Sequence, residues 1–94
     1  IPLESSLSLD VFPNPSSGRT NFALNLNEDA KLDIRIYDLL GKEVMSKIID
    51  ETLPAGSHTI EVDASALSQG VYTYKMMVTG TQTSLLTGRL VINR

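Results

Sequence analysis

Short stretches of alternating hydrophobic and polar residues follow one another along the whole chain. In the clearest of them, from Lys31 to Tyr37, the aliphatic residues Leu32, Ile34 and Ile36 share one parity and the charged residues take the other. Because successive side chains of an extended backbone point to opposite faces, this pattern places the aliphatic side chains on one face and the charged ones on the other. It predicts a half-buried β-strand.

A turn and a second extended run follow this strand. Asp38 suits the first position of a tight turn and Gly41 suits the last. The run from Lys42 to Ile49 is again extended in character. Together these residues predict a β-hairpin near the centre of a sheet.

The same alternation predicts further strands at residues 7–12, 21–26, 58–62, 71–79 and 86–92. Turn-forming residues separate them, including a rigid turn from Pro13 to Gly18, because proline fixes φ and restricts the residue before it. Residues 63–70 are too short and too rich in serine for a stable helix, and we expect at most one helical or 3₁₀ turn around residues 65–67. Gly88, inside the last predicted strand, indicates a bulge or a close approach of backbone.

Seven short strands without helical periodicity are typical of an all-β chain, and we predict an immunoglobulin-like antiparallel β-sandwich. We expect residues 7–94 to form one domain and residues 1–6 to be the end of a linker. Leu67, Gly70 and Tyr72 have the spacing of a tyrosine corner, in which the phenol hydroxyl bonds to upstream backbone. This motif favours the immunoglobulin-like form of the sandwich.

The length, composition and net charge of the chain exclude several kinds of site and partner. The chain of 94 residues has no cysteine, which excludes disulfides and thiolate metal sites, and its formal net charge of −3 argues against a nucleic-acid partner. No apolar run approaches the ~20 residues that a membrane span needs. The chain starts at Ile1 rather than methionine, and we read it as a piece of a longer protein.

The charges are unevenly distributed. All eleven acidic residues lie between Glu4 and Asp63, whereas the remaining residues carry only Lys75, Arg89 and Arg94. Two interpretations fit this asymmetry. Either the final strands are buried and polar only in hydroxyl groups, or the C-terminal part presents a mildly basic surface to a partner.

The sequence contains no recognisable catalytic, cofactor-binding or metal-binding constellation. His58 is the only histidine, and the adjacent acidic pairs Glu28–Asp29 and Asp50–Glu51 fall in predicted loops. No serine stands in a G-x-S-x-G motif. Tryptophan, the usual platform for sugar rings, is absent.

Several motifs in order resemble a known family. They are Val11-Phe12-Pro13-Asn14-Pro15-Ser16-Ser17-Gly18, the run from Leu32 to Val44 that contains Tyr37-Asp38-Leu39-Leu40-Gly41, then Ala55-Gly56-Ser57-His58, and Asp63-Ala64-Ser65-Ala66-Leu67-Ser68-Gln69-Gly70-Val71-Tyr72. From about Leu9 to Arg94 the chain resembles the type A C-terminal sorting domain of the type IX secretion system of Bacteroidetes.

This resemblance implies a seven-stranded immunoglobulin-like sandwich at the extreme C-terminus of an exported protein, with no catalytic activity of its own. It implies two partners, the outer-membrane translocon, which recognises the domain after periplasmic transit, and a sortase-like surface protease, which removes it at the cell surface. We expect a monomer. The family motifs map onto Pro13, Asn14 and Pro15, onto Asp38, Leu39 and Gly41, onto Gly70 and Tyr72, and onto the tail Leu90 to Arg94, with Arg89 in the place of the family's lysine.

We predict that the basic last strand is the surface that a receptor recognises. It comprises Arg89, Leu90, Val91, Ile92, Asn93 and Arg94. If this strand lies at a sheet edge, its backbone can pair with a receptor strand while the arginines make charge contacts. Pro13, Asn14, Pro15, Gly41 and Gly70 are interpreted as turn makers. The alternative function is an immunoglobulin-like accessory or adhesion module of a cell-surface protein, for example one that binds polysaccharide, and the position of the domain in the full-length precursor separates the two.

Overall fold

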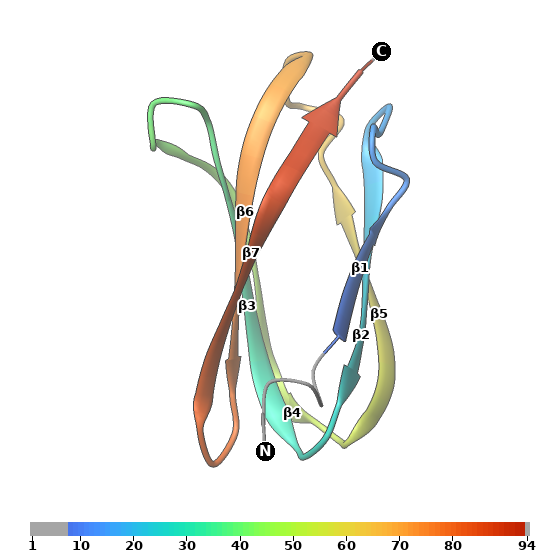
Figure 1. Cartoon of the computed structure of the whole chain (residues 1–94), viewed down its shortest axis with the longest axis vertical. Coiled ribbons are helices and arrows are strands. Elements are labelled where there is room, and N and C mark those ends of the chain that lie inside the picture. The colour runs from blue at the N-terminus through green and yellow to red at the C-terminus, as the bar shows by residue number, and fades with distance from the viewer. Residues whose placement is uncertain (1–7, 94) are drawn as a thin grey trace.

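The computed structural model describes residues 8–93, which form an all-β fold of seven antiparallel strands in two sheets (Figure 1). The strands are β1 (Ser8–Phe12), β2 (Arg19–Leu26), β3 (Ala30–Tyr37), β4 (Glu43–Leu53), β5 (Gly56–Asp63), β6 (Gly70–Thr79) and β7 (Thr83–Ile92). One sheet has the order β1-β2-β5 and the other has the order β4-β3-β6-β7. The predicted β-sandwich is confirmed.

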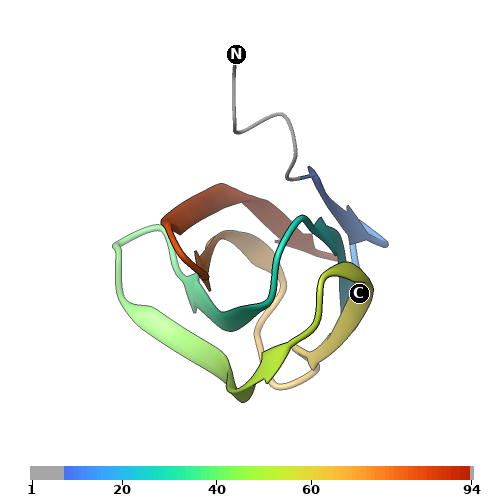
Figure 2. The same cartoon turned by 90° about the horizontal axis from the view of Figure 1, so that it is seen from below.

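The two sheets pack face to face, with β4 and β5 closing one side of the sandwich and β1 and β7 lying on the other (Figure 2). Burial along β3 alternates as its sequence predicts, and Leu32, Ile34 and Ile36 are almost wholly buried. The core continues into the facing sheet, where the ring of Phe22 meets that of Tyr74 edge to face at a centroid distance of 5.2 Å. Such a contact adds a small gain to the hydrophobic burial of both rings.

The predicted hairpin forms, but its second strand is not central. β3 lies inside the four-stranded sheet, whereas β4 is one of its two edge strands. β4 also continues to Leu53, through residues 50–53 that the sequence predicts as a loop, because Leu53 pairs with Ala30 after a shift in register. Its edge is protected by two such irregularities and by Lys47, a charged residue on the inward parity opposite Ile34.

Two predicted details of the C-terminal strands are confirmed. The hydroxyl of Tyr72 donates a hydrogen bond of 2.6 Å to the carbonyl of Ser68, with Leu67 buried beneath, as in a tyrosine corner. Gly88 pairs with Tyr74, and a side-chain carbon at Gly88 would collide with the phenol ring. The glycine therefore marks a close approach.

Residues 63–70 contain a turn in which the Leu67 amide bonds to the Ala64 carbonyl at 3.0 Å, within the limit of one helical turn predicted there. The last strand begins at Thr83, whereas the sequence predicts its start at residue 86. The strand is longer than predicted because it pairs along the full length of β6. No helix among residues 8–93 has the length and apolar character to cross a membrane. The predicted linker at residues 1–6 lies outside the described residues.

Candidate recognition surface

β7 is an edge strand, which the recognition hypothesis requires. Within it the residues predicted to meet a receptor do not share one environment. Leu90 and Ile92 have no exposed surface and belong to the core, whereas Arg89 and Asn93 are exposed. Val91 is half-buried, and Arg94 lies outside the described residues. Among the described residues, the exposed side chains of the predicted tail are therefore Arg89 in β7 and Asn93 just after it.

A loop already occupies the outer edge of this end of β7. The side-chain amide of Asn14 donates to the Arg89 carbonyl at 2.9 Å, and its oxygen accepts from the Val91 amide at 3.0 Å. The backbone of Ser16 then forms a parallel bridge with Ile92, donating to the Val91 carbonyl and accepting from the Asn93 amide, both at 2.8 Å. The loop thus ties the edge of one sheet to the edge of the other.

The side chain of Ser16 holds this loop in shape. Its hydroxyl donates to the Arg19 carbonyl at 2.9 Å and accepts from the Gly18 amide at 3.0 Å, and the residue is 1% exposed. Pro13 and Pro15 both follow cis peptide bonds. The loop that contains Pro13, Asn14 and Pro15 therefore also binds the end of β7.

Among residues 8–93, the other half of the β7 edge is open to a further strand. The outward hydrogen bonds of Arg89, Val91 and Asn93 identify the odd-numbered residues as those whose peptide groups point away from β6. By the alternation of an antiparallel ladder, the peptide groups of Leu85 and Thr87 point the same way. No other described strand pairs with them.

The β3–β4 loop is a second exposed feature. The Asp38 carboxylate accepts hydrogen bonds from the amides of Leu40 and Lys42, both at 2.9 Å. The Asp38 backbone bonds to Lys42 and Gly41, and Gly41 has φ of +87°, a left-handed conformation that favours glycine. Asp38 and Gly41 therefore hold the turn at its two ends, and Leu39 and Leu40 lie between them, 75% and 94% exposed.

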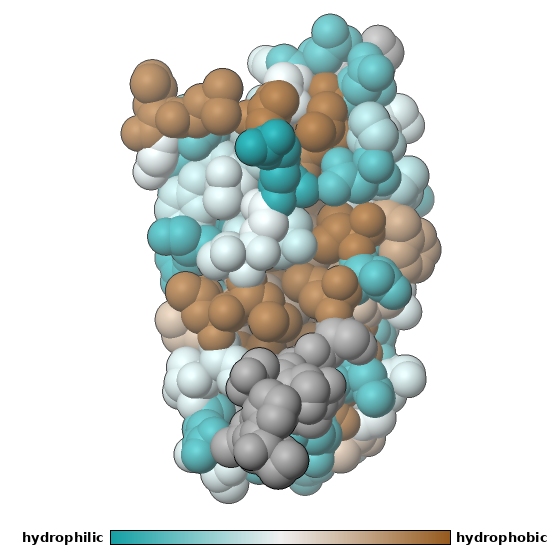
Figure 3. Space-filling view, viewed as in Figure 1, coloured by the Kyte–Doolittle hydropathy of each residue, from teal (hydrophilic) through white to brown (hydrophobic). Residues whose placement is uncertain are grey.

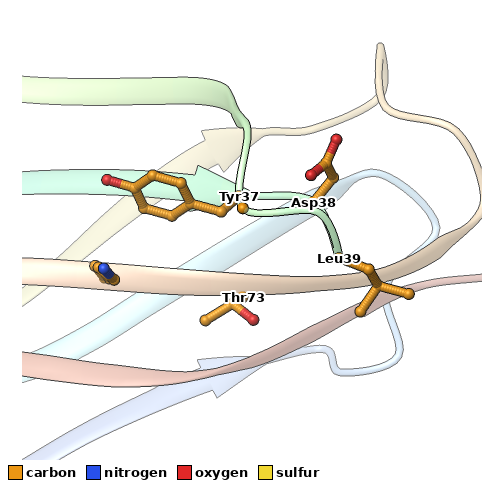
Figure 4. A pocket seen from close by; sticks show the side chains of 6 residues that line it. Tyr37, Asp38, Leu39 and Thr73 are labelled. Carbon is orange, nitrogen blue, oxygen red and sulfur yellow. The ribbon is translucent and has the colours of Figure 1, made fainter.

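A shallow hollow of about 290 Å³ lies beside this loop, between the ends of β3 and β6. Its lining includes Tyr37, Leu39, Thr73 and Lys75. Figure 4 shows Leu39 reaching over β6 on the side of Thr73, with the Tyr37 ring along the hollow. The Lys75 ammonium lies 5.0 Å from the centre of that ring, within the range of a cation–π contact.

Comparison with known proteins identifies the chain. Residues 10–93 match the family described as the secretion system C-terminal sorting domain. The chain belongs to this family. A sorting domain of the type IX system marks an exported protein that goes to the cell surface or outside, through interaction with the secretion system, and the family is not an enzyme family.

The comparison with curated protein sequences found no match. Among solved structures, the sorting domain is similar to the soluble domain of PmoD from a Methylocystis species, with 18% identity, a TM-score of 0.55, and coverage of 93% of this chain and 90% of that one. At this identity the likeness shows the fold alone.

The charges of the sorting domain on the outer face of the four-stranded sheet fall into two groups. Arg35 is paired with Asp33 and with Glu43 at 3.0 Å each, and its pKa is raised by the hydrogen bonds to Asp33 and then Glu43. Lys75, by contrast, has no carboxylate within ion-pair distance among residues 8–93. Arg89 stands opposite Thr73, diagonal to Lys75. Of the basic residues in the C-terminal part, Lys75 and Arg89 are exposed, and Arg94 lies outside the described residues.

No group of three His, Cys, Asp or Glu side chains lies close enough to hold a metal among residues 8–93. Tyr72 and Tyr74 are buried, and burial raises the pKa of the Tyr74 phenol. His58 bonds to the Pro54 carbonyl at the rim of the sandwich.

Sequence reasoning missed the hollow and the exposure of Leu40. Tyr37, Thr73 and Lys75 come together only through the pairing of β3 with β6, which is not visible in a local pattern. One signal was available, because Leu39 and Leu40 occupy the two middle positions of a turn, where polar residues and glycine are usual.

Proposed function

We propose that this chain is the label of an exported cargo protein, recognised in its folded state by the outer-membrane translocon and afterwards removed by a sortase-like surface protease. The observation that carries the proposal is the match to the sorting-domain family over residues 10–93. The cargo reaches the translocon from the periplasm. The label itself contributes surfaces for contact and no chemistry.

The fold supports recognition of the domain as a whole. Leu90 and Ile92, in the tail, are core residues, and Asn14 and Ser16 bind the backbone around them. A tail with these contacts cannot be extracted as a free peptide without loss of core packing. The receptor therefore meets a finished sandwich with Arg89 and Asn93 exposed at the end of β7.

The receptor binds the open half of the β7 edge by adding a strand to the sheet. Leu85 and Thr87 direct backbone donors and acceptors outward, and an added receptor strand satisfies such groups by extending the sheet. Arg89 stands at the junction between the open and the occupied half, where it supplies a charge contact. This arrangement keeps the predicted edge pairing but moves it from the tail toward Thr83–Thr87.

A fusion experiment tests the function. Residues 7–94 are attached to the C-terminus of a periplasmic reporter in cells with, and without, a working type IX system. We expect the reporter outside the outer membrane only when both the domain and the system are present, and its mature C-terminus, measured by mass spectrometry, to lack the domain. Retention of the reporter in the periplasm of cells with a working system would overturn the proposal.

A pair of substitutions at one position tests the edge contact. Thr87→Pro removes an outward amide without breaking a bond to β6, which is the situation in which strands tolerate proline. Thr87→Ala removes the side chain and keeps the amide. We expect export to fall with proline and to persist with alanine, while both purified domains stay folded. Equal export of the two variants would contradict strand addition at this edge.

A further inference from the structure

The β3–β4 loop exposes two leucines to water. In Figure 3 hydrophobic side chains form the projecting tip at the upper left, where this loop lies in Figure 1. Leu40 is the most exposed of the large hydrophobic residues, and Leu39 follows it. Exposed leucines lose the favourable transfer from water that burial provides, and a contiguous exposed apolar patch is a feature of interaction sites.

The loop is also held in one conformation. Asp38 fixes it through bonds to the amides of Leu40 and Lys42, and Gly41 supplies the left-handed turn residue. A tip that is already ordered loses little conformational freedom on binding. The rigidity of the turn therefore serves the presentation of its two leucines.

The neighbouring hollow indicates what kind of partner fits. Its volume of about 290 Å³ is at the small end of the range for ligand sites, which suits an inserted side chain. Lys75 lies in its wall without a carboxylate partner among the described residues, and Lys42 is exposed on the loop itself. The Asp38 carboxylate also lines the hollow and keeps its negative charge, with both amides bonded to its Oδ1, so the positive charges that a partner meets here are those of Lys75 and Lys42.

We propose that Leu39, Leu40 and the hollow beside them form a docking surface for a protein of the secretion machinery. The partner takes the two leucines into an apolar pocket and places an acidic side chain in the hollow against Lys75. A fluid lipid surface has no side chain of fixed shape to insert into the hollow beside the leucines. The hollow therefore favours a protein as the partner. The inference rests on the proposed function and names a contact of the same label, separate from the β7 edge.

The test uses the reporter fusion with matched surface variants. The double variant Leu39→Ser with Leu40→Ser removes the tip, and Lys75→Glu reverses the charge in the hollow. Ile48→Ser and Lys47→Glu are the controls, because Ile48 is a 56% exposed hydrophobic residue and Lys47 an exposed lysine, both on β4. Thermal unfolding of each purified domain checks that the variants fold.

We expect export to fall at least about tenfold with the double variant and several-fold with Lys75→Glu, since a docking contact concentrates its affinity in a few residues. The two controls export like the original sequence. If the original fusion is exported and the folded double variant is exported equally well, the docking surface is overturned while the sorting function stands. If the original fusion itself fails, the sorting function is overturned.

Two binding measurements exclude other occupants. Co-sedimentation with vesicles of phosphatidylcholine and phosphatidylglycerol, lost in the double variant, would assign the tip to a lipid surface and overturn the protein partner. Sedimentation of the purified domain as a dimer that the double variant abolishes would assign it to a second copy, with the same consequence. The proposal expects neither.

Discussion

Two loops of this domain contain similar kinds of residues but make different contacts. Both combine turn-forming residues with an amide or carboxylate side chain, Asn14 in the loop from Pro13 to Gly18 and Asp38 in the β3–β4 loop. Asn14 reaches across to bond β7, 75 and 77 positions further along the chain. Asp38 bonds only within its own loop.

The difference shows that a turn motif can serve the fold or serve a partner. The Pro13–Gly18 loop directs its polar groups to the rest of the domain, and it closes the side of the sandwich where β1 and β7 meet. The β3–β4 loop satisfies its polar groups internally and leaves its apolar side chains in water. Stability measurements separate the two roles, because loss of the Ser16 contacts is predicted to destabilise the domain, whereas loss of the exposed leucines Leu39 and Leu40 is predicted to leave its stability unchanged.

Truncation after Arg89 should have the largest effect. It removes Leu90 and Ile92, both without exposed surface, together with the strand end that the Pro13–Gly18 loop binds. Loss of one such buried side chain costs about 2–5 kcal/mol, and a domain of this size is stable by about 5–15 kcal/mol. We expect a chain without dispersed NMR signals at 25 °C. Removal of Arg94 alone is the control, and a folded domain after the longer truncation would refute the role of this strand end.

Ser16→Ala should come next. The substitution leaves the Gly18 amide without its acceptor in a position with almost no access to water, at a cost of about 1–3 kcal/mol. For a domain of this length that corresponds to a fall in Tm of roughly 4–8 °C for each kcal/mol. Ser17→Ala is the matched control because Ser17 is exposed. Calorimetry that found equal Tm values for the two variants would deny this loop its structural role.

The fold was far easier to predict than the contacts between loops. Alternation along β3 is a local property, so the period of two revealed the strand and its buried face. The edge position of β4 and its extension to Leu53 depend on pairing with Ala30, which lies 23 residues earlier, and no local pattern contains that register. The bond from Asn14 to Arg89 is hidden for the same reason.

The candidate site was harder still, because hydrophobicity alone does not say whether a side chain is covered. Leu39 and Leu90 are the same residue, yet one is 75% exposed and the other has no exposed surface. Leu90 stands in a strand whose alternation predicts an inner face. Leu39 stands in a turn, where the backbone conformation alone decides its direction.

Gly41→Ala should destabilise the domain by about 1–2 kcal/mol, through backbone strain alone. The residue has φ of +87°, which L-residues reach only at that cost, and an added methyl group would meet nothing within 4 Å. Gly70→Ala is the comparison, since Gly70 does not have a positive φ and its new carbon would touch the Tyr72 ring at an ordinary 3.9 Å. Chemical denaturation that ranked Gly70→Ala as the more damaging would contradict this reading of the turn.

The smallest effect is expected at the tip, and it decides the comparison between the two loops. Leu39→Ser with Leu40→Ser should change the free energy of unfolding by no more than about 0.5 kcal/mol, because surface substitutions without buried contacts rarely do more. Leu24→Ser, at a position 4% exposed in β2, should by contrast lose several kcal/mol through the lost packing and the buried hydroxyl. A marked loss of stability in the double variant would mean that the leucines support the fold, and the contrast with the Pro13–Gly18 loop would disappear. If the stability is unchanged, the β3–β4 turn keeps two leucines exposed to water without stabilising the folded chain. A surface that exists to bind a partner must meet this condition.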